Sequence, residues 1–377
     1  MMRRALWGLA ALVVLGGVAV GLELLGRVYP DQLMPADWRR AYFMSHYPFR
    51  TVPDPDVGFR VPSNQRALVE THDYTYLLET DADGFPNREP RPERAAVVVL
   101  GDSLATAPGV DFDKSFVQLL AAARPGEAVV NLAVAAAGPE RQYAIFRKYG
   151  ASLEPRVVMA CIYPASDFEN DEPFRAWLAA EPRPDYDRFR LDTAVQAHDP
   201  GWLGRQLQKS WMYASLREAA LGVWEGDAHL PQHRRLPDGT DLLFGKNELA
   251  FASTAAAPDD PRLGPLVDAV VRFRDAVEHV GATFVVVLIP SKEELFAVAP
   301  ERTAANLASR AEARLREAGL AVVSLYAPLR RLGETEAPFF SQDSHLTEAG
   351  NRVAADALLR WLDEHVPLAH RRRPEND

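Results

Sequence analysis

A serine, a histidine and an aspartate stand in two short segments that together could perform nucleophilic catalysis. The first segment is VVVLGDSLATAPG, in which Gly101, Asp102 and Ser103 follow a run of apolar residues. The second is FFSQDSHLTEAGN, in which one residue separates Asp343 from His345. A serine hydroxyl is a weak nucleophile unless a base takes its proton, and the base needs an acid that orients it. We therefore expect Ser103 as nucleophile, His345 as base and Asp343 as the orienting acid.

The segments around these residues predict how they meet. Short apolar runs rich in β-branched residues, typical of strands buried on both faces, alternate with helical patterns. The runs cover 95–100, 128–134, 156–163, 282–290 and 319–326, and the helical patterns cover 114–124, 139–151, 262–280, 301–318 and 347–365. This alternation predicts a doubly wound, three-layer α/β sandwich with a five-stranded parallel sheet. Right-handed crossovers would bring Ser103 and His345 to one edge of that sheet, with Asp102 shaping the turn.

The start of the chain predicts export. Within residues 1–28, MMRR precedes an uncharged apolar run from Ala5 to Leu22, which is long enough to span a membrane. Arg3 and Arg4 would hold the N-terminus in the cytoplasm, so we expect a single-pass anchor in a bacterial inner membrane. A signal peptide cleaved near Ala19-Val20-Gly21 is the alternative. Both interpretations send the remaining chain to the periplasm or the cell exterior.

The rest of the chain divides by composition. We expect an extended lead-in over 29–94, a catalytic domain over 95–366 with an inserted cap at about 170–261, and a basic and polar tail over 367–377. The cap is rich in proline, and its tryptophans could form a platform for a glycan or acyl group, or could build a small core of their own. These tryptophans are Trp177, Trp202, Trp211 and Trp224.

Charge and cysteine content exclude some classes. The formal net charge of −10 and the lack of a basic stripe disfavour nucleic acid as a partner. Cys161 is the single cysteine, so no internal disulfide can form. It lies in the apolar run VVMACIY, which predicts a buried, inert thiol.

The quoted segments resemble the SGNH (GDSL) hydrolase family. GDSL stands at 101–104, and a DxH pair precedes the C-terminal helix. The likeness continues after the second and third strands, in the segments VVNLAVAAAGPERQ and YPASDFEND. Two segments further upstream, DPDVGFRVPSN and DADGFPNRE, resemble membrane-anchored bacterial members of the family. The resemblance implies a flavodoxin-like sheet. An α/β-hydrolase is the rival, because GDSLA nearly fits GxSxG, but in that fold several strands precede the nucleophile.

The resemblance also implies an oxyanion hole. Its donors would be the backbone N–H of Ser103, a glycine N–H after the second strand and an asparagine side chain after the third. In this chain the glycine position falls at Ala136, with Gly138 two residues beyond. The asparagine position falls at Ser166, whose hydroxyl could donate or could only cap the following turn, and Asn170 is an outside candidate.

These features predict a serine-dependent hydrolase of esters, an esterase or deacetylase acting on a cell-envelope or extracellular glycan or a small acyl ester. No metal or organic cofactor is required. LIPSKEELF at 288–296 is similar to the Pro-x-Lys segment of alginate-type exopolysaccharide O-acetyltransferases, so an O-acetyltransferase is the alternative. Lys292 would then meet an acidic glycan or a donor, or would be a solvated residue at a helix start. A second alternative is a catalytically weak, tethered glycan-binding protein.

Overall fold

The computed structural model describes residues 2–29, 51–71, 73–190, 210, 212, 233–298 and 305–366. The chain divides into two compact units, the first formed by Met1–Tyr47 with Ala194–Gln232 and the second by Pro48–Thr193 with His233–Asp377. In the first unit, α1 (Met2–Val28) carries Glu23, which accepts a hydrogen bond from the hydroxyl of Ser210. In contrast to the expected anchor, none of the helices in the described part of the chain has the length and apolar character needed to cross a membrane.

The second unit is built on a five-stranded sheet in which all neighbouring strands run parallel, as the sequence predicts. The strands are β5 (Val97–Leu100), β6 (Val129–Asn131), β7 (Val157–Ile162), β10 (Thr283–Leu288) and β11 (Val322–Ser324). Their order in the sheet is β11-β10-β7-β5-β6. The chain passes from β5 to β6 on one side and then crosses back over β5 to β7 on the other side. The C-terminal end of β5 is thus a point where the strand order reverses, which is where such folds bind ligands.

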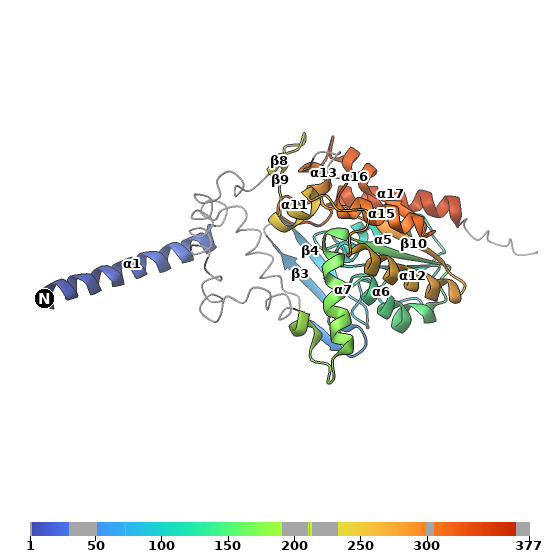
Figure 1. Cartoon of the computed structure of the whole chain (residues 1–377), viewed down its shortest axis with the longest axis horizontal. Coiled ribbons are helices and arrows are strands. Elements are labelled where there is room, and N and C mark those ends of the chain that lie inside the picture. Colours follow the sequence, from blue (N-terminus) through green and yellow to red (C-terminus); the bar gives the residue numbers. More distant parts are fainter. Residues whose placement is uncertain are drawn as a thin grey trace, which may run out of the picture. The chain divides into compact units, whose positions relative to one another are not determined.

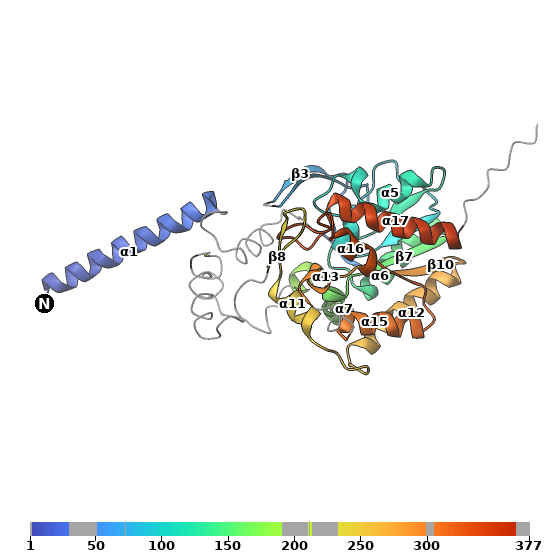
Figure 2. The same cartoon turned by 90° about the horizontal axis from the view of Figure 1, so that it is seen from above.

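Helices cover both faces of this sheet (Figure 1). Figure 2 shows β7 and β10 between α5 and α17 on one side and α12 and α15 on the other. Successive strand residues point to opposite faces, so Val97 and Val99 join one buried cluster while Val98 and Leu100 join the other. The continuous apolar runs of the sequence follow from this double coverage. The helices that flank the sheet include α5 (Phe116–Ala123), α6 (Pro139–Ile145), α12 (Leu263–His279), α15 (Leu307–Glu317) and α17 (Glu348–His365).

Short helical elements connect these layers at the edges of the sheet. They are α4 (Ser103–Thr106), η1 (Phe112–Lys114), η2 (Phe146–Gly150), η3 (Ala151–Leu153), α13 (Lys292–Phe296) and α16 (Tyr326–Leu332). Several expected helices start or end a few residues away from the predicted bounds. The helix expected over 139–151, for example, ends as α6 at Ile145 and continues as a π-helical turn, η2.

The lead-in forms two antiparallel hairpins where the sequence predicts an extended segment. One joins β1 (Val52–Asp54) to β2 (Gly58–Arg60), and the other joins β3 (Arg66–Glu70) to β4 (Thr75–Glu79). Val57, Phe59 and Phe85 are buried in the same cluster as one face of the sheet. The described residues of the lead-in from Thr51 onward are therefore packed into the second unit.

The region expected to form a cap is only partly described. α7 (Pro164–Ala179) starts directly after β7, so the expected boundary near 170 falls inside this helix. Trp177 is buried against Phe174 and Tyr186 in the cluster of the sheet, so this tryptophan is a core residue. Further along are β8 (His233–Arg235), β9 (Asp241–Leu243) and α11 (Lys246–Ser253). Trp202, Trp211, Trp224 and the tail over 367–377 lie outside the described residues.

Candidate active site

Asp343 and His345 lie against each other in the loop before α17. Nδ1 of His345 is 2.5 Å from Oδ1 of Asp343, and the backbone N–H of His345 donates to the same oxygen at 3.0 Å. Both residues are buried, with exposed fractions of 5% and 8%. Burial alone would raise the pKa of Asp343, but His345 and the hydrogen bonds from His345 and Tyr74 lower it far below its usual range. An ionised Asp343 that accepts the Nδ1 proton leaves Nε2 of His345 available as a base.

The second oxygen of Asp343 is held by a residue that sequence reasoning missed. The hydroxyl of the buried Tyr74 donates to Oδ2 of Asp343 at 2.6 Å. Beside it, Asp73 accepts hydrogen bonds from the backbone N–H groups of Gln342 and Asp343 at 2.7 and 2.6 Å. Tyr74 is 269 positions before Asp343 in the chain, so no local spacing could reveal the contact. The lead-in thus supplies part of the site.

Lys292 holds the same loop through its carbonyl groups. The lysine side chain is fully buried, and its Nζ donates to the carbonyl oxygens of Ser341, Gln342 and Asp343 at 2.9, 3.1 and 3.0 Å. Both interpretations from sequence, a contact for a glycan or donor and a solvated lysine, are therefore wrong. A buried ammonium requires several acceptors to offset the loss of water, and the loop backbone provides them.

Ser103 is the first residue of α4 and is half-buried at the C-terminal end of β5. As expected, Asp102 shapes this turn, because its carboxylate accepts the N–H of Leu104 at 2.9 Å as the N-cap of α4. Gly101 permits the close approach of β7. A Cβ at Gly101 would stand only 2.8 Å from the Cβ of Cys161. The GDS sequence therefore fixes the backbone that presents the serine.

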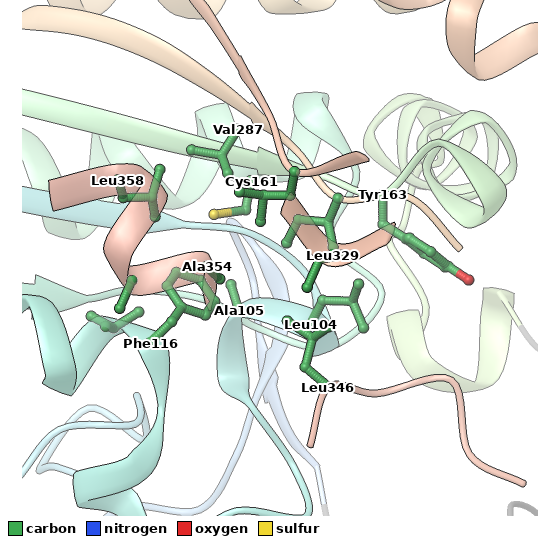
Figure 3. Close-up of a cluster of buried hydrophobic side chains, with 14 of the residues drawn as sticks. Leu104, Ala105, Phe116, Cys161, Tyr163, Val287, Leu329, Leu346, Ala354 and Leu358 are labelled. Carbon is green, nitrogen blue, oxygen red and sulfur yellow. The ribbon is translucent and has the colours of Figure 1, made fainter. Parts of the chain in front are cut away.

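The structure brings the two segments of the expected triad to the same place. Leu104 and Leu346, which directly follow Ser103 and His345, are buried in one cluster (Figure 3). The carboxyl group of Asp102 is also close enough to His345 for their charges to interact. The loop that carries His345 therefore lies near the turn that carries Ser103.

Three buried carboxyl groups lie in the serine turn and in the first half of α7. Burial raises the pKa of Asp102 to about 6 and that of Asp171 to about 7. Burial and repulsion from Asp102 raise the pKa of Asp167 well above its usual range. Burial likewise raises the pKa of the Cys161 thiol, in keeping with an inert cysteine.

Ala136 occupies the expected glycine position and adopts a glycine-like backbone. Its φ of 56° lies in the left-handed region that favours glycine. The buried guanidinium of Arg141 holds this turn, because it donates to the carbonyl oxygens of Ala135 and Ala136 at 2.9 and 3.3 Å. Gly138 has a separate reason to be glycine, since a Cβ there would stand 2.4 Å from Oδ1 of Asp171.

Ser166 lies in the first turn of α7 and faces the serine turn. Its hydroxyl hydrogen bonds to the carboxyl group of Asp102 and accepts Nδ2 of Asn170 at 3.4 Å. Tyr163 is the N-cap of α7, so Ser166 does not cap this helix. Ser166 therefore lies beside Asp102, the residue that precedes Ser103, with Asn170 one helical turn further along α7.

A pocket of about 430 Å³ lies further along the same edge of the sheet, where β10 and β11 end. Pro164, two residues before Ser166, belongs to its wall. Most of the lining is apolar, with the carboxylates of Glu294 and Glu312 among it. Over the residues that the structure describes, no three His, Cys, Asp or Glu side chains are grouped as metal ligands.

Comparisons with known proteins concern mainly the C-terminal part. Residues 241–376 match the family model described as "SGNH hydrolase-like domain, acetyltransferase AlgX". A probable alginate O-acetylase AlgJ from Pseudomonas syringae pv. tomato is 30% identical over 100 residues, which are 25% of this chain and 26% of that protein. The chain thus matches about a quarter of the length of this curated relative.

Several solved structures are similar at low sequence identity. A GDSL-like lipase from Bacteroides thetaiotaomicron is 10% identical with a TM-score of 0.34, covering 73% of this chain and 91% of that one. A lipase/acylhydrolase from Enterococcus faecalis is 12% identical with a TM-score of 0.36, covering 71% of this chain and 95% of that one.

Proposed function

We propose that this protein is an enzyme that cleaves acyl esters or transfers their acyl groups through Ser103. The proposal is supported by the match to an SGNH hydrolase-like family model and by the likeness to an alginate O-acetylase. The observation that carries the proposal is the buried hydrogen bond between Asp343 and His345, at the sheet edge where Ser103 begins α4. A serine, a histidine and an acid in this arrangement suit acyl transfer.

In the proposed reaction, Oγ of Ser103 attacks the ester carbonyl while its proton passes to Nε2 of His345. Asp343 stabilises the imidazolium, and the N–H groups of Ser103 and of Ala136 or Gly138, helped by Ser166, hold the oxyanion. When the intermediate collapses, the C–O bond to the alcohol breaks and the alcohol takes the proton from His345. Water or a sugar hydroxyl then attacks the acyl-serine and gives its proton to Nε2 of His345. When this second intermediate collapses, the bond between the acyl carbon and Oγ of Ser103 breaks, and Oγ takes the proton back from His345.

Two fates of the acyl group follow from this scheme. Attack by water makes the protein an esterase or deacetylase of a glycan or small acyl ester. Attack by a sugar hydroxyl makes it an O-acetyltransferase, which the match to an acetyltransferase family model and the likeness to an alginate O-acetylase favour as a second candidate. The pocket at the ends of β10 and β11, with Pro164 in its wall, offers space for part of an acceptor or donor.

The test is incubation of the full chain with p-nitrophenyl acetate, with and without an acidic polysaccharide, while free acetate and glycan-bound acetyl are measured. Release of acetate alone indicates a hydrolase, and acetyl on the glycan indicates a transferase. Ser103→Ala should remove both activities. Glycan binding without any acetyl release would favour the tethered glycan-binding alternative and contradict the proposal.

We also propose that this domain acts in the periplasm or outside the cell, with the N-terminal segment directing export. The proposal is supported by Arg3 and Arg4 before the apolar run from Ala5 to Leu22. A periplasm-dependent reporter fused to the C-terminus should be active. Activity of a cytoplasm-dependent reporter alone at this position would contradict the proposal.

A further inference from the structure

The turn between β3 and β4 reaches into the proposed active site. The turn is closed on itself, because the backbone N–H and hydroxyl of Thr71 both donate to the carbonyl of Tyr74, at 2.9 and 3.2 Å. From this turn Asp73 accepts two backbone N–H groups of the loop at 342–343, and Tyr74 donates to the carboxylate of Asp343. Two successive residues of the lead-in thus hold the backbone and the side chain around one acid.

The ring of Tyr74 has a fitted place beside this loop. Its centroid lies 4.6 Å from that of Phe340, and Tyr76 flanks it at 5.9 Å. Gly109, with a φ of 90°, makes room for both rings. A Cβ at Gly109 would stand 2.5 Å from Phe340 and 2.9 Å from Tyr74. The backbone of a third loop therefore accommodates the position of Tyr74.

The two oxygens of Asp343 have separate tasks. Oδ1 accepts both the backbone N–H of His345 and the bond with Nδ1, while Oδ2 accepts the Tyr74 hydroxyl. A carboxylate held on one oxygen alone can rotate about its Cβ–Cγ bond, whereas two opposed bonds fix its plane. Loss of the tyrosine hydroxyl would also leave a buried charged oxygen short of a donor.

We propose that Tyr74 is a positioning residue of the acyl-transfer reaction, whose hydroxyl fixes the Asp343 carboxylate in the orientation that meets Nδ1 of His345. This inference rests on the proposed function of Ser103. Tyr74 touches neither the serine nor the reacting carbonyl in this scheme, and it acts through Asp343 alone. Asp73 supports it by holding the backbone of the same loop.

A double-mutant cycle on the full chain tests the inference. The variants are Tyr74→Phe, Asp343→Asn and the double substitution, with Tyr76→Phe as the matched control from the same hairpin. The rate constant for labelling by a fluorophosphonate and the urea midpoint of unfolding are measured for each. Tyr74→Phe should slow labelling about tenfold to a hundredfold, the scale of a misplaced catalytic group. In the Asp343→Asn background it should slow labelling no further, and Tyr76→Phe should change the rate less than twofold.

The outcomes separate this inference from the proposed function. If Tyr74→Phe labels as fast as wild type, or slows labelling equally in the Asp343→Asn background, Tyr74 does not act through Asp343 and the inference is overturned. If the wild type is not labelled at Ser103, the proposed function fails. The catalytic role of Tyr74 then fails as well. In that case the urea midpoints test only the contact between Tyr74 and Asp343: non-additive losses of stability at the two positions support the contact, and additive losses contradict it.

Discussion

Asp102 and Ser103 are neighbours with different tasks. Asp102 caps α4 through the N–H of Leu104, while Ser103 presents its hydroxyl at the sheet edge. The sequence predicts both roles, because Gly, Asp and Ser at a strand end form turns and a distant DxH pair supplies a base. The protonation behaviour of Asp102 depends on burial, which the sequence does not display.

Asp102→Asn tests that burial. The pKa of Asp102 is about 6 in the folded state, above the ordinary 3.8. Between these two pH values the folded state keeps the proton of Asp102, while the unfolded state has lost it. Stability from this group is therefore full at acidic pH and falls as the pH rises from about 4 to 6. Asn keeps the cap and cannot ionise. The free energy of unfolding of the variant minus that of wild type should therefore be about 1–3 kcal/mol larger at pH 7.5 than at pH 4.5. Urea unfolding at both pH values measures this.

The account of Asp102 is refuted if Asp102→Asn and wild type differ by the same free energy of unfolding at both pH values.

Ser166 stands where the resemblance implies an asparagine. Ser166→Asn should preserve or raise kcat/KM for one small ester, because an amide reaches further and donates with a fixed direction. Ser166→Ala should lower kcat/KM by up to about a hundredfold, on the scale of a lost oxyanion donor. Equal values for all three proteins would mean that Ser166 only supports Asp102, and Asn170 would be the next candidate.

At the scale of elements, the strands and helices of the sheet domain were predictable and the lead-in hairpins were not. β5, β7 and β10 are buried on both faces, which leaves continuous apolar runs in the sequence. β1 and β2 have three residues each, too few for a periodic pattern. Nor does any pattern show which distant loop a hairpin turn will contact, and so Asp73 and Tyr74 could not be found.

Lys292 shows the same limit, and its substitution tests how the loop at 340–343 is held. Lys292→Met removes a buried ammonium group and leaves several carbonyl oxygens of the loop without their hydrogen-bond donor. The free energy of unfolding should therefore fall by at least about 2 kcal/mol. Lys114→Met, which removes an exposed ion pair with Glu348, should lower the free energy of unfolding much less, because water and salt screen this pair. Chemical unfolding of the two variants measures the contrast, and equal losses would contradict the role assigned to Lys292.

At the scale of the whole molecule, the parallel sheet collects loops from distant parts of the chain at one edge. The loops after β5, β6 and β7 bring Ser103, Ala136 and Ser166 to this edge, as the alternation of strands and helices predicts. The match to the acetyltransferase family model covers 241–376 and so includes Asp343 and His345 without Ser103. The proposed chemistry therefore depends above all on the partnership of Ser103 with His345.

Fluorophosphonate labelling of the full chain, followed by identification of the labelled peptide, tests this claim most directly. The wild type should be labelled at Ser103, and Ser103→Ala should lose labelling while its free energy of unfolding stays close to that of wild type. His345→Ala should lose labelling about as severely, because the two residues act as one unit. Full-strength labelling of Ser103→Ala would show that another residue is the nucleophile, and the account of this site would be wrong.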